Sequence, residues 1–429
     1  MGHAVVAVRQ LTVSVAFHQI SRNALRFPST LVFLRLDIGG SQLLPWGLAP
    51  LSQGLTGVAT TLRQLRLGIA YMGIKDPEFV EFCETGLRSL VGLETLSLDA
   101  SHNWLNTVVV DALPRANHRA LRRACLNLGW NYDVRHVCLH HMKCVDTLDL
   151  DIANTCMESV HIPDSVTTLV VDMRNVQCDA VFVPPTMRIN RDGLRHMTLH
   201  LDAPTVGILG ALPSSACPAA ATLCLNLMLM LDLSDREPMQ RALAPITEYD
   251  ATVVLKMLHL RYVGVTLRES HRFTSTLGSW RSLVWLRLEM YTTLEKSRVH
   301  AILSAVTDHL DCLLGFEFTL GDPNTTLCSD TLSPCIRFAR PGGSVRNLIL
   351  DFTGIRLMDL AVALVASTAV LRREYNADHT TTVRVQGSSV GAHGVRVLSS
   401  AVTAAGCVFY FHPPMSTDVD NIRRMCSSL

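Results

Sequence analysis

The chain has 429 residues, of which 48% are hydrophobic and only 17% are charged, and its mean hydropathy is +0.25. This composition excludes a disordered chain, because enough apolar surface is present to offset the entropy lost on folding. Lysine and arginine total 38 against 37 aspartate and glutamate residues, so the formal charge of +1 predicts no nucleic-acid partner. The 13 cysteines lack the spacing of a disulfide framework and indicate reduced thiols in an intracellular protein.

The N-terminal segment is basic and free of acidic residues before Asp37. It lacks the charged start, apolar core and small-residue cleavage site of a secretory signal. A basic segment without acids is also typical of organelle transit peptides. We therefore expect a cytoplasmic protein, with a mitochondrial or other organellar location as the alternative.

A short block of the form apolar-x-x-apolar-x-apolar recurs along the chain and predicts a strand at each occurrence. Consecutive blocks start 21 to 35 residues apart, and the copies near Leu121 and Leu371 are weaker. The blocks begin at Val8, Leu31, Leu62, Leu93, Leu121, Val145, Val166, Leu194, about 220, Leu255, Leu283, Leu313, Val345 and Leu371.

Segments between blocks carry helical periodicity, most clearly over 76–92, over 297–310 and from Asp359. In the first of these we expect Asp76 as N-cap, Pro77 at the first helical position and Gly92 after the end. The residues predicted to face inward there are Phe79, Val80, Phe82, Cys83, Leu87 and Leu90. Between Val134 and Val183 the blocks lie closer together, so an extended, unusually curved or partly helix-free stretch is expected there.

The segment TLCLNLMLMLDL alternates leucine with other residues and predicts a long strand, with Met228 and Met230 on its outer face. Residues 203–231 carry no charge and are long enough to cross a bilayer. Pro204, Pro213 and Pro218 together with the alternating leucines argue against a transmembrane helix. We therefore predict no transmembrane segment.

The blocks resemble the LxxLxL segments of leucine-rich repeat proteins, and their long strand–helix period resembles the ribonuclease-inhibitor-like class of that family. The resemblance implies an α/β solenoid, a horseshoe with a parallel inner sheet and outer helices. It extends over 1–412 as a single domain of about 12–14 irregular repeats, and a C-terminal capping helix is expected over 413–429. The Asn or Cys that family members place three residues after the last Leu is mostly missing, as in LRLDIGG and LSLDASH.

In a horseshoe of this type, the residues between the leucines form rows on the concave face. We expect this face to bind a protein partner through Phe33, Arg35, Asp37, Arg66, Asp99, Asp149, Asp151, Asp172, Met228, Met230, Trp285, Arg287, Glu289 and Asp351. The acidic residues that end the blocks form one of these rows, the acidic row, and two interpretations of it stay open. The aspartates either bind a basic protein segment or accept backbone N–H groups in the turn after each strand.

His136, Cys138, His140, His141 and Cys144 are zinc ligands by residue type, but their spacing matches no zinc pattern. We therefore predict no metal and no cofactor. The sequence also contains no glycine-rich phosphate loop, GxSxG elbow, HExxH motif or redox CxxC pair, which argues against an enzyme.

The resemblance and the missing catalytic motifs together favour a non-catalytic protein-protein interaction scaffold. The high apolar content indicates a structural or accessory subunit of a larger, multi-subunit complex. The alternative is a regulatory leucine-rich repeat protein, either a GTPase activator or a ubiquitin-ligase substrate receptor.

Overall fold

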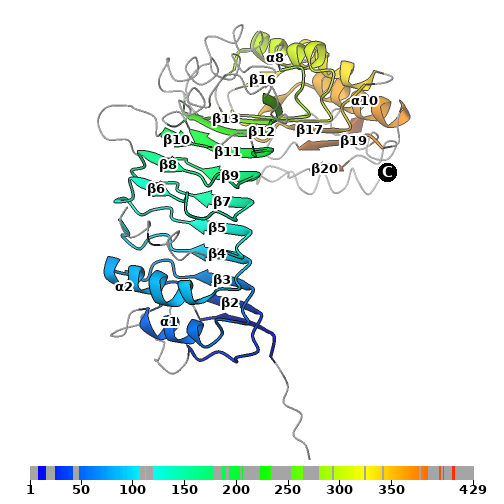
Figure 1. Cartoon of the computed structure of the whole chain (residues 1–429). Coiled ribbons are helices and arrows are strands. Elements are labelled where there is room, and N and C mark those ends of the chain that lie inside the picture. Colours follow the sequence, from blue (N-terminus) through cyan, green and yellow to red (C-terminus); the bar gives the residue numbers. More distant parts are fainter. Residues whose placement is uncertain are drawn as a thin grey trace, which may run out of the picture. The chain divides into compact units, whose positions relative to one another are not determined.

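The computed structural model contains two compact units, one formed by residues 1–225 with 249–253 and the other by 226–248 with 254–429. It describes residues 8–15, 25–41, 48–106, 112, 119–176, 186–189, 193–202, 205, 223–232, 253–263, 280–291, 294–322, 325–340, 343–375, 378–384, 396–397, 400 and 408–410. Both units are of α/β class and are built on parallel strands (Figure 1).

The first unit is organised around a parallel sheet of eight strands in the order β1-β2-β3-β4-β5-β7-β9-β11. The strands are β1 (Gln10–Ser14), β2 (Phe33–Asp37), β3 (Gln64–Gly68), β4 (Thr95–Asp99), β5 (Arg123–Asn127), β7 (Thr147–Asp151), β9 (Thr168–Asp172) and β11 (His196–Asp202). Each predicted block up to Leu194 therefore carries a strand, including the weak copy near Leu121.

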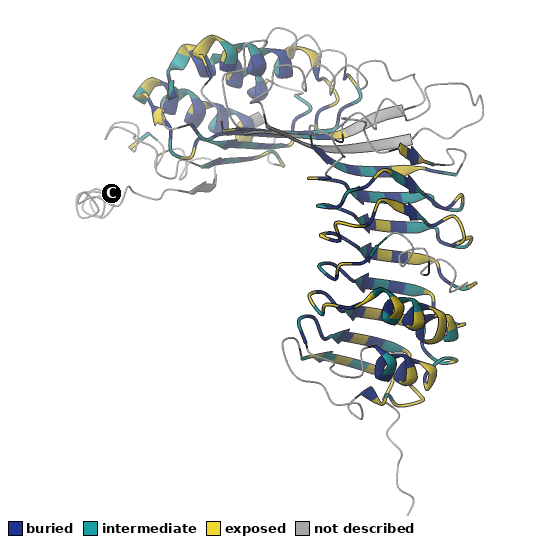
Figure 2. Ribbon diagram, turned by 90° about the vertical axis from the view of Figure 1, so that its left-hand side faces the viewer, coloured by how far each residue is buried: buried dark blue, intermediate teal, exposed yellow. Residues whose placement is uncertain are grey.

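The alternation of each block explains these strands, because successive side chains point to opposite faces of a sheet. In β3, Leu65 and Leu67 are 0% and 2% exposed, whereas the intervening Arg66 is exposed. The same two leucine positions are buried in β2 and β4, and their stacked side chains form the core of the unit (Figure 2).

The segments that connect these strands change character along the first unit. Early connections contain α1 (Ala49–Thr56) and α2 (Asp76–Glu81), which continues into the π-helix η2 (Phe82–Leu87). Later connections instead contribute β6 (His136–Cys138), β8 (Ser159–His161) and β10 (Thr186–Arg188), which pair as a second parallel sheet. These helices and short strands lie on the same side of the long sheet (Figure 1). The expected helix-free stretch is confirmed for the described connections between Val134 and Val176.

The start of α2 differs from the sequence prediction. Lys75, with an extended backbone, is the N-cap, so Asp76 is already the first helical residue and the prediction of an Asp76 cap is wrong. The Asp76 carboxylate instead accepts a hydrogen bond from Asn106. The inward face is confirmed, since the predicted residues other than the partly exposed Val80 are buried.

Two buried asparagines connect neighbouring turns of the first unit. Asn131 Oδ1 accepts the backbone N–H of Asn103 at 3.0 Å, and its Nδ2 donates to the carbonyls of Leu128 at 2.8 Å and Ala100 at 3.1 Å. Both asparagines are 0% exposed. Each follows the last leucine of its block by five residues rather than three. The side chain of Asn131 therefore ties its own turn to the preceding turn of this unit.

The second unit contains a parallel sheet whose strands follow the order β13-β14-β15-β17-β19-β20, preceded in the chain by β12 (Leu223–Asp232). These strands are β13 (Val253–Val263), β14 (Trp285–Tyr291), β15 (Gly315–Leu320), β17 (Asn347–Asp351), β19 (Thr380–Arg384) and β20 (Val408–Tyr410). A separate pair is formed by β16 (Thr326–Leu327) and β18 (Arg356–Leu357).

Helices cover one face of this sheet (Figure 1). They are α8 (Lys296–His309), α9 (Ser329–Leu332), the 3-10 helix η3 (Ser333–Ala339) and α10 (Asp359–Tyr375). The helices predicted over 297–310 and from Asp359 are confirmed. The weak block at Leu371 is wrong as a strand, because the run from Asp359 has helical periodicity and the next strand is β19. All six residues of β15 are buried, on both faces of the sheet.

Arg372 is a fully buried arginine that joins three segments of the second unit. It is 1% exposed on α10. Its Nε donates to Thr381 Oγ1 at 3.0 Å, its Nη1 to the carbonyl of Phe338 at 2.9 Å, and its Nη2 to the carbonyls of Val345 at 2.9 Å and Arg346 at 3.2 Å. The planar guanidinium therefore connects η3, the start of β17 and the start of β19.

Within the described ranges, no helix combines the length and apolar character needed to cross a membrane. The expected capping helix over 413–429 lies outside the described residues. The single domain over 1–412 stays a prediction.

Candidate functional site

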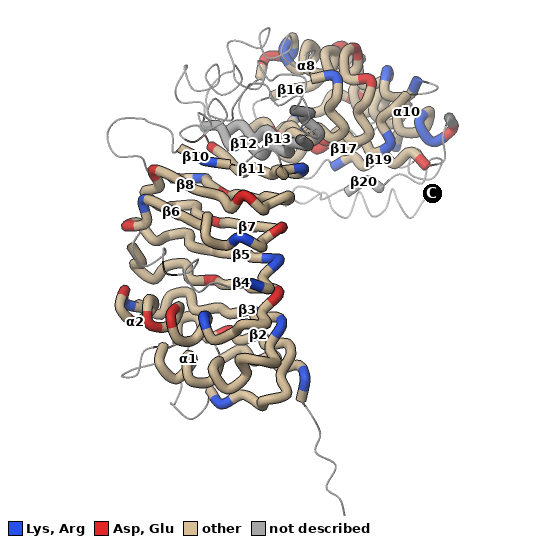
Figure 3. The backbone as a smooth tube through the Cα atoms, in the orientation of Figure 1, with Lys and Arg blue, Asp and Glu red and all other residues tan. Residues whose placement is uncertain are grey.

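The predicted rows of polar side chains exist in the first unit, and strand register aligns them. Basic and acidic residues both occur along the strands of this unit (Figure 3). Arg35 pairs in register with Arg66, and both side chains are exposed on the sheet face. Phe33 lies two residues earlier on the same face and is half-buried. Among the described residues, neither arginine side chain forms a hydrogen bond or an ion pair. Two like charges thus lie side by side without a counter-ion, an arrangement that disfavours the isolated fold.

The acidic row follows the strands and has a clear structural role. The carboxylate or amide Oδ1 of each row member accepts the backbone N–H two residues later, at 3.0–3.2 Å, in the turn that ends the strand. These residues are Asp37, Asp99, Asn127, Asp151, Asp172 and Asp351. The turn interpretation of this row is therefore confirmed. One carboxylate oxygen of each aspartate is occupied, and binding of a partner by the row stays a prediction.

Negative charge gathers on β7 and β9. Asp151 lies in register with Asp172, and Arg174 Nε donates to Asp172 Oδ1 at 2.9 Å. Burial raises the pKa of Asp151 above its ordinary value, opposed by the Ala153 N–H hydrogen bond. Asp149 is exposed, two residues before Asp151 on the same face, and its Oδ2 accepts a 3.7 Å hydrogen bond from Cys125 Sγ.

Six predicted residues fall in the second unit instead, so the predicted residues are divided between the two units. Arg287 Nη2 lies 2.6 Å from Glu289 Oε1, and its Nε lies 3.4 Å from Glu317 Oε2. His259 Nε2 is 3.0 Å from the same Glu289 oxygen. Both glutamates are buried, and burial raises the pKa of Glu317 although Arg287 and Arg384 act against it. Each glutamate therefore lies beside Arg287, whose buried Nε forms no hydrogen bond among the described residues.

Trp285 and Asp351 also have partners within the second unit. A Cβ added to Gly315 would lie 2.1 Å from Trp285 Cε3, so the indole lies over this glycine. Asp351 Oδ2 is 3.5 Å from Arg384 Nη1. Met228 and Met230 belong to β12, but their side chains lie outside the described part of the structure.

The histidines and cysteines near β6 form pairs rather than a metal site. Cys138 Sγ lies 2.7 Å from His140 Nδ1 and 3.5 Å from His161 Nδ1, its neighbour in register on β8. His136 contacts Ser159 at 2.8 Å instead. Among the residues that the structure describes, no three potential ligands, Cys144 included, are grouped to hold a metal ion.

An exposed cluster that the sequence analysis did not identify lies in the turns after β3, β4 and β5. The rings of Tyr71 and His102 stack with centroids 3.9 Å apart, and those of His102 and Trp130 with centroids 5.0 Å apart. Both pairs are 16° from parallel. We call Tyr71, His102 and Trp130 the aromatic column. Tyr71 is 59% and Trp130 44% exposed, and Tyr132 packs edge-on against Trp130.

The column residues adopt a backbone conformation that bulky side chains rarely take. Their φ values are +56°, +57° and +61°. Each follows the last leucine of its block by four residues, and the corresponding residues in other repeats are Gly40, Asn154, Asn175 and Gly354, also at positive φ. A side chain in this region costs about 1–2 kcal/mol, and only glycine, asparagine and aspartate adopt it routinely. The sequence signal that could have located the aromatic column is this fixed spacing of four residues after the last leucine of each block.

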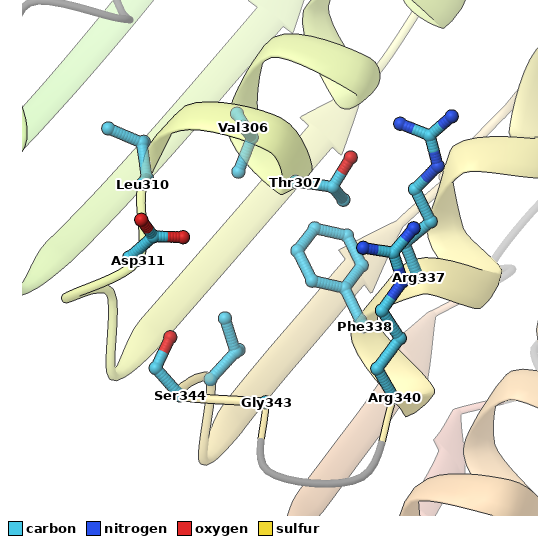
Figure 4. Close-up of a pocket in the computed structure, with 10 residues that line it drawn as sticks. Val306, Thr307, Leu310, Asp311, Arg337, Phe338, Arg340, Gly343 and Ser344 are labelled. Atoms are coloured by element: carbon cyan, nitrogen blue, oxygen red, sulfur yellow. The ribbon is translucent and has the colours of Figure 1, made fainter.

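A cavity of about 280 Å³ lies beside the end of α8 in the second unit (Figure 4). Val306, Leu310 and Phe338 form its apolar wall, and Asp311 and Arg340 contribute charge. No residue predicted for partner binding lines this cavity.

The sequence matches no protein-family model, and no curated protein shows significant similarity to it.

Proposed function

We propose that this chain is a non-catalytic protein-interaction scaffold, a subunit of a larger assembly, and that its stacked parallel strands form an irregular leucine-rich-repeat-like solenoid. The regular strand–connection order and the buried leucine positions support the solenoid. The exposed sheet face of the first unit is the proposed binding surface.

The Arg35–Arg66 pair carries this proposal. Neighbouring like charges on a sheet disfavour folding, and a partner carboxylate relieves this repulsion. Arginine suits such contacts, because its guanidinium presents a planar fork of donors to a carboxylate.

The charge pattern also orients a partner. The basic pair lies on β2 and β3, and the acidic residues Asp149, Asp151 and Asp172 lie on β7 and β9. From β3 to β7 there are three strand spacings, about 14 Å at roughly 4.8 Å each. A partner segment with acidic and basic ends at this separation would bind in one direction, because the reverse direction places like charges together.

Native size-exclusion fractionation of the source cell tests the proposal. The wild-type chain should elute well above its 47.2 kDa, at a constant ratio to the same co-eluting proteins. R35E/R66E should elute near its own mass, whereas R188E/R356E, with the same charge change at exposed residues outside this face, should behave as wild type. Circular dichroism establishes that both variants are folded. Elution of the wild type as a monomer, or unaltered co-elution of R35E/R66E, overturns the proposal.

A further inference from the structure

The open end of the aromatic column has the features of a second binding element in the first unit. The turns of the column stack directly, because the N–H of each positive-φ residue donates to a carbonyl in the next turn. Gly40 donates to Ala70 at 2.6 Å, Tyr71 to Ser101 at 3.2 Å and His102 to Gly129 at 3.2 Å. Gly40 therefore occupies the position next to Tyr71 and brings no side chain to it.

Among the described residues, no ring covers the face of Tyr71 that lies opposite His102. His102 has a ring on each side, whereas the only column partner of Tyr71 among the described residues is His102. Tyr71 is also the most exposed member, at 59%. Bulky residues at positive φ are disfavoured and tend to persist where a function requires them. Burial does not explain this ring, so a ligand that stacks on it is the physical alternative.

Two carboxylates belong to the turns beside this end of the column, Asp37 in the Gly40 turn and Asp99 in the His102 turn. Asp37 Oδ1 lies 2.8 Å from where a Cβ on Gly68 would be, so this carboxylate lies over Gly68, three residues before Tyr71. That oxygen accepts the Gly39 N–H at 3.2 Å, which leaves Oδ2 for a ligand. Asp99 lies in the next turn but one from Asp37, and neither carboxylate has an ion-pair partner among the described residues. Burial lowers the pKa of His102, so at neutral pH the column adds no positive charge of its own.

We infer that the Tyr71 face above Gly40 binds an arginine side chain of the partner protein, which stacks on the ring and pairs with Asp37. The inference rests on the proposed function and names one chemical feature of the partner. A guanidinium is planar, stacks on aromatic faces and donates to carboxylates in the same geometry, whereas an ammonium group lacks the planar surface. The partner segment then combines this arginine with the carboxylates that bind Arg35 and Arg66.

Short peptides test the inference on the full chain, without the natural partner. The probes are acetyl-Gly-Ser-Xaa-Ser-Gly-amide peptides with arginine, lysine, citrulline or tyrosine at Xaa. The readout is the NMR ring-current shift of the Xaa side-chain protons, which stacking on an aromatic ring produces. The arginine peptide should bind with a millimolar Kd, at least fivefold more tightly than the other three.

Two variants locate the site. Y71N removes the ring, and G40N fills the space beside it with the residue that Asn154 and Asn175 already provide at this turn position. Each should weaken arginine-peptide binding at least tenfold. G354N makes the same substitution at the matching positive-φ position of the second unit and should bind as wild type. Far-ultraviolet circular dichroism establishes folding of each variant.

Equal binding of the four peptides, stronger binding of the tyrosine peptide, or full binding by G40N overturns the arginine assignment. The result is separable from the fractionation test, because peptide binding needs no assembly. If the arginine peptide binds while the wild-type chain fractionates as a monomer, the scaffold proposal fails and the arginine site stands. If the chain co-elutes with partners but no peptide shows a ring-current shift, the scaffold proposal stands and this inference fails.

Discussion

Replacing Arg372 with leucine should destabilise the second unit strongly. The substitution removes the three shortest guanidinium hydrogen bonds, to Thr381 Oγ1 at 3.0 Å and to the Phe338 and Val345 carbonyls at 2.9 Å each. A buried group left without its partner costs about 1–3 kcal/mol. Part of this cost is recovered, because leucine removes a buried charge and its side chain still fills part of the apolar space that the arginine occupied. We therefore expect a loss of about 4 kcal/mol in the free energy of unfolding.

Urea denaturation, monitored in each unit separately by hydrogen–deuterium exchange, measures this loss. With an m value of about 2 kcal/mol/M, the midpoint of the second unit should fall by about 2 M, and that of the first unit should not move. The adjacent, exposed Arg373 supplies the control, because R373L alters the same helix and the same charge. R372K should lose most of the stability as well, since an ammonium group cannot reach all three acceptors. At this m value, a difference of about 0.5 M in midpoint corresponds to about 1 kcal/mol. If the midpoints of R372L and R373L differ by less than that, the role assigned to the guanidinium is refuted.

Three further predictions concern the first unit and the effect of pH. N131A should lower the free energy of unfolding by about 3 kcal/mol in urea titration, because it leaves the buried N–H groups of Asn103 and Leu105 and the carbonyl of Leu128 unpaired. D151N should preserve or raise the thermal midpoint, since its amide oxygen still accepts the Ala153 N–H without a half-buried charge, whereas D151A should cost about 1 kcal/mol. Equal losses for D151N and D151A would contradict the turn role. Stability should also fall as pH drops through 6.5, because burial lowers the pKa of His102, His200 and His379 from 6.5 and the unfolded chain then binds protons first. H102N/H200N/H379N should flatten this pH profile, and an unchanged slope would count against the assignment.

The strands could be predicted because burial of a leucine face imposes its alternation directly on the sequence. Register then followed, since each block contributes the same positions, and the Arg35–Arg66 pairing was accessible from spacing alone. The acidic row was located for the same reason. Its chemistry was not decided by sequence, because an aspartate after a strand suits either a turn or a ligand, and only the Oδ1 contacts with backbone N–H groups distinguish them.

The features that sequence reasoning missed depend on geometry outside the blocks. The aromatic column requires a positive φ at one turn position, where bulky residues such as tyrosine and tryptophan are not expected. The β6-β8-β10 sheet consists of three-residue strands, too short for a period to be detected. Arg372 looks like its neighbour Arg373, a cation near the end of a helix, and only tertiary packing separates the buried one from the exposed one.

The complete burial of β15 has a consequence for the hydrogen exchange of its amides. An amide in this strand can exchange with solvent only when both covering layers open, since the sheet neighbours β14 and β17 flank it and neither face is exposed. Opening of that extent approaches unfolding of the whole second unit. The amides of Phe316 and Phe318 should therefore exchange with the free energy of global unfolding of this unit, and they provide the upper limit with which local opening elsewhere in the unit can be compared.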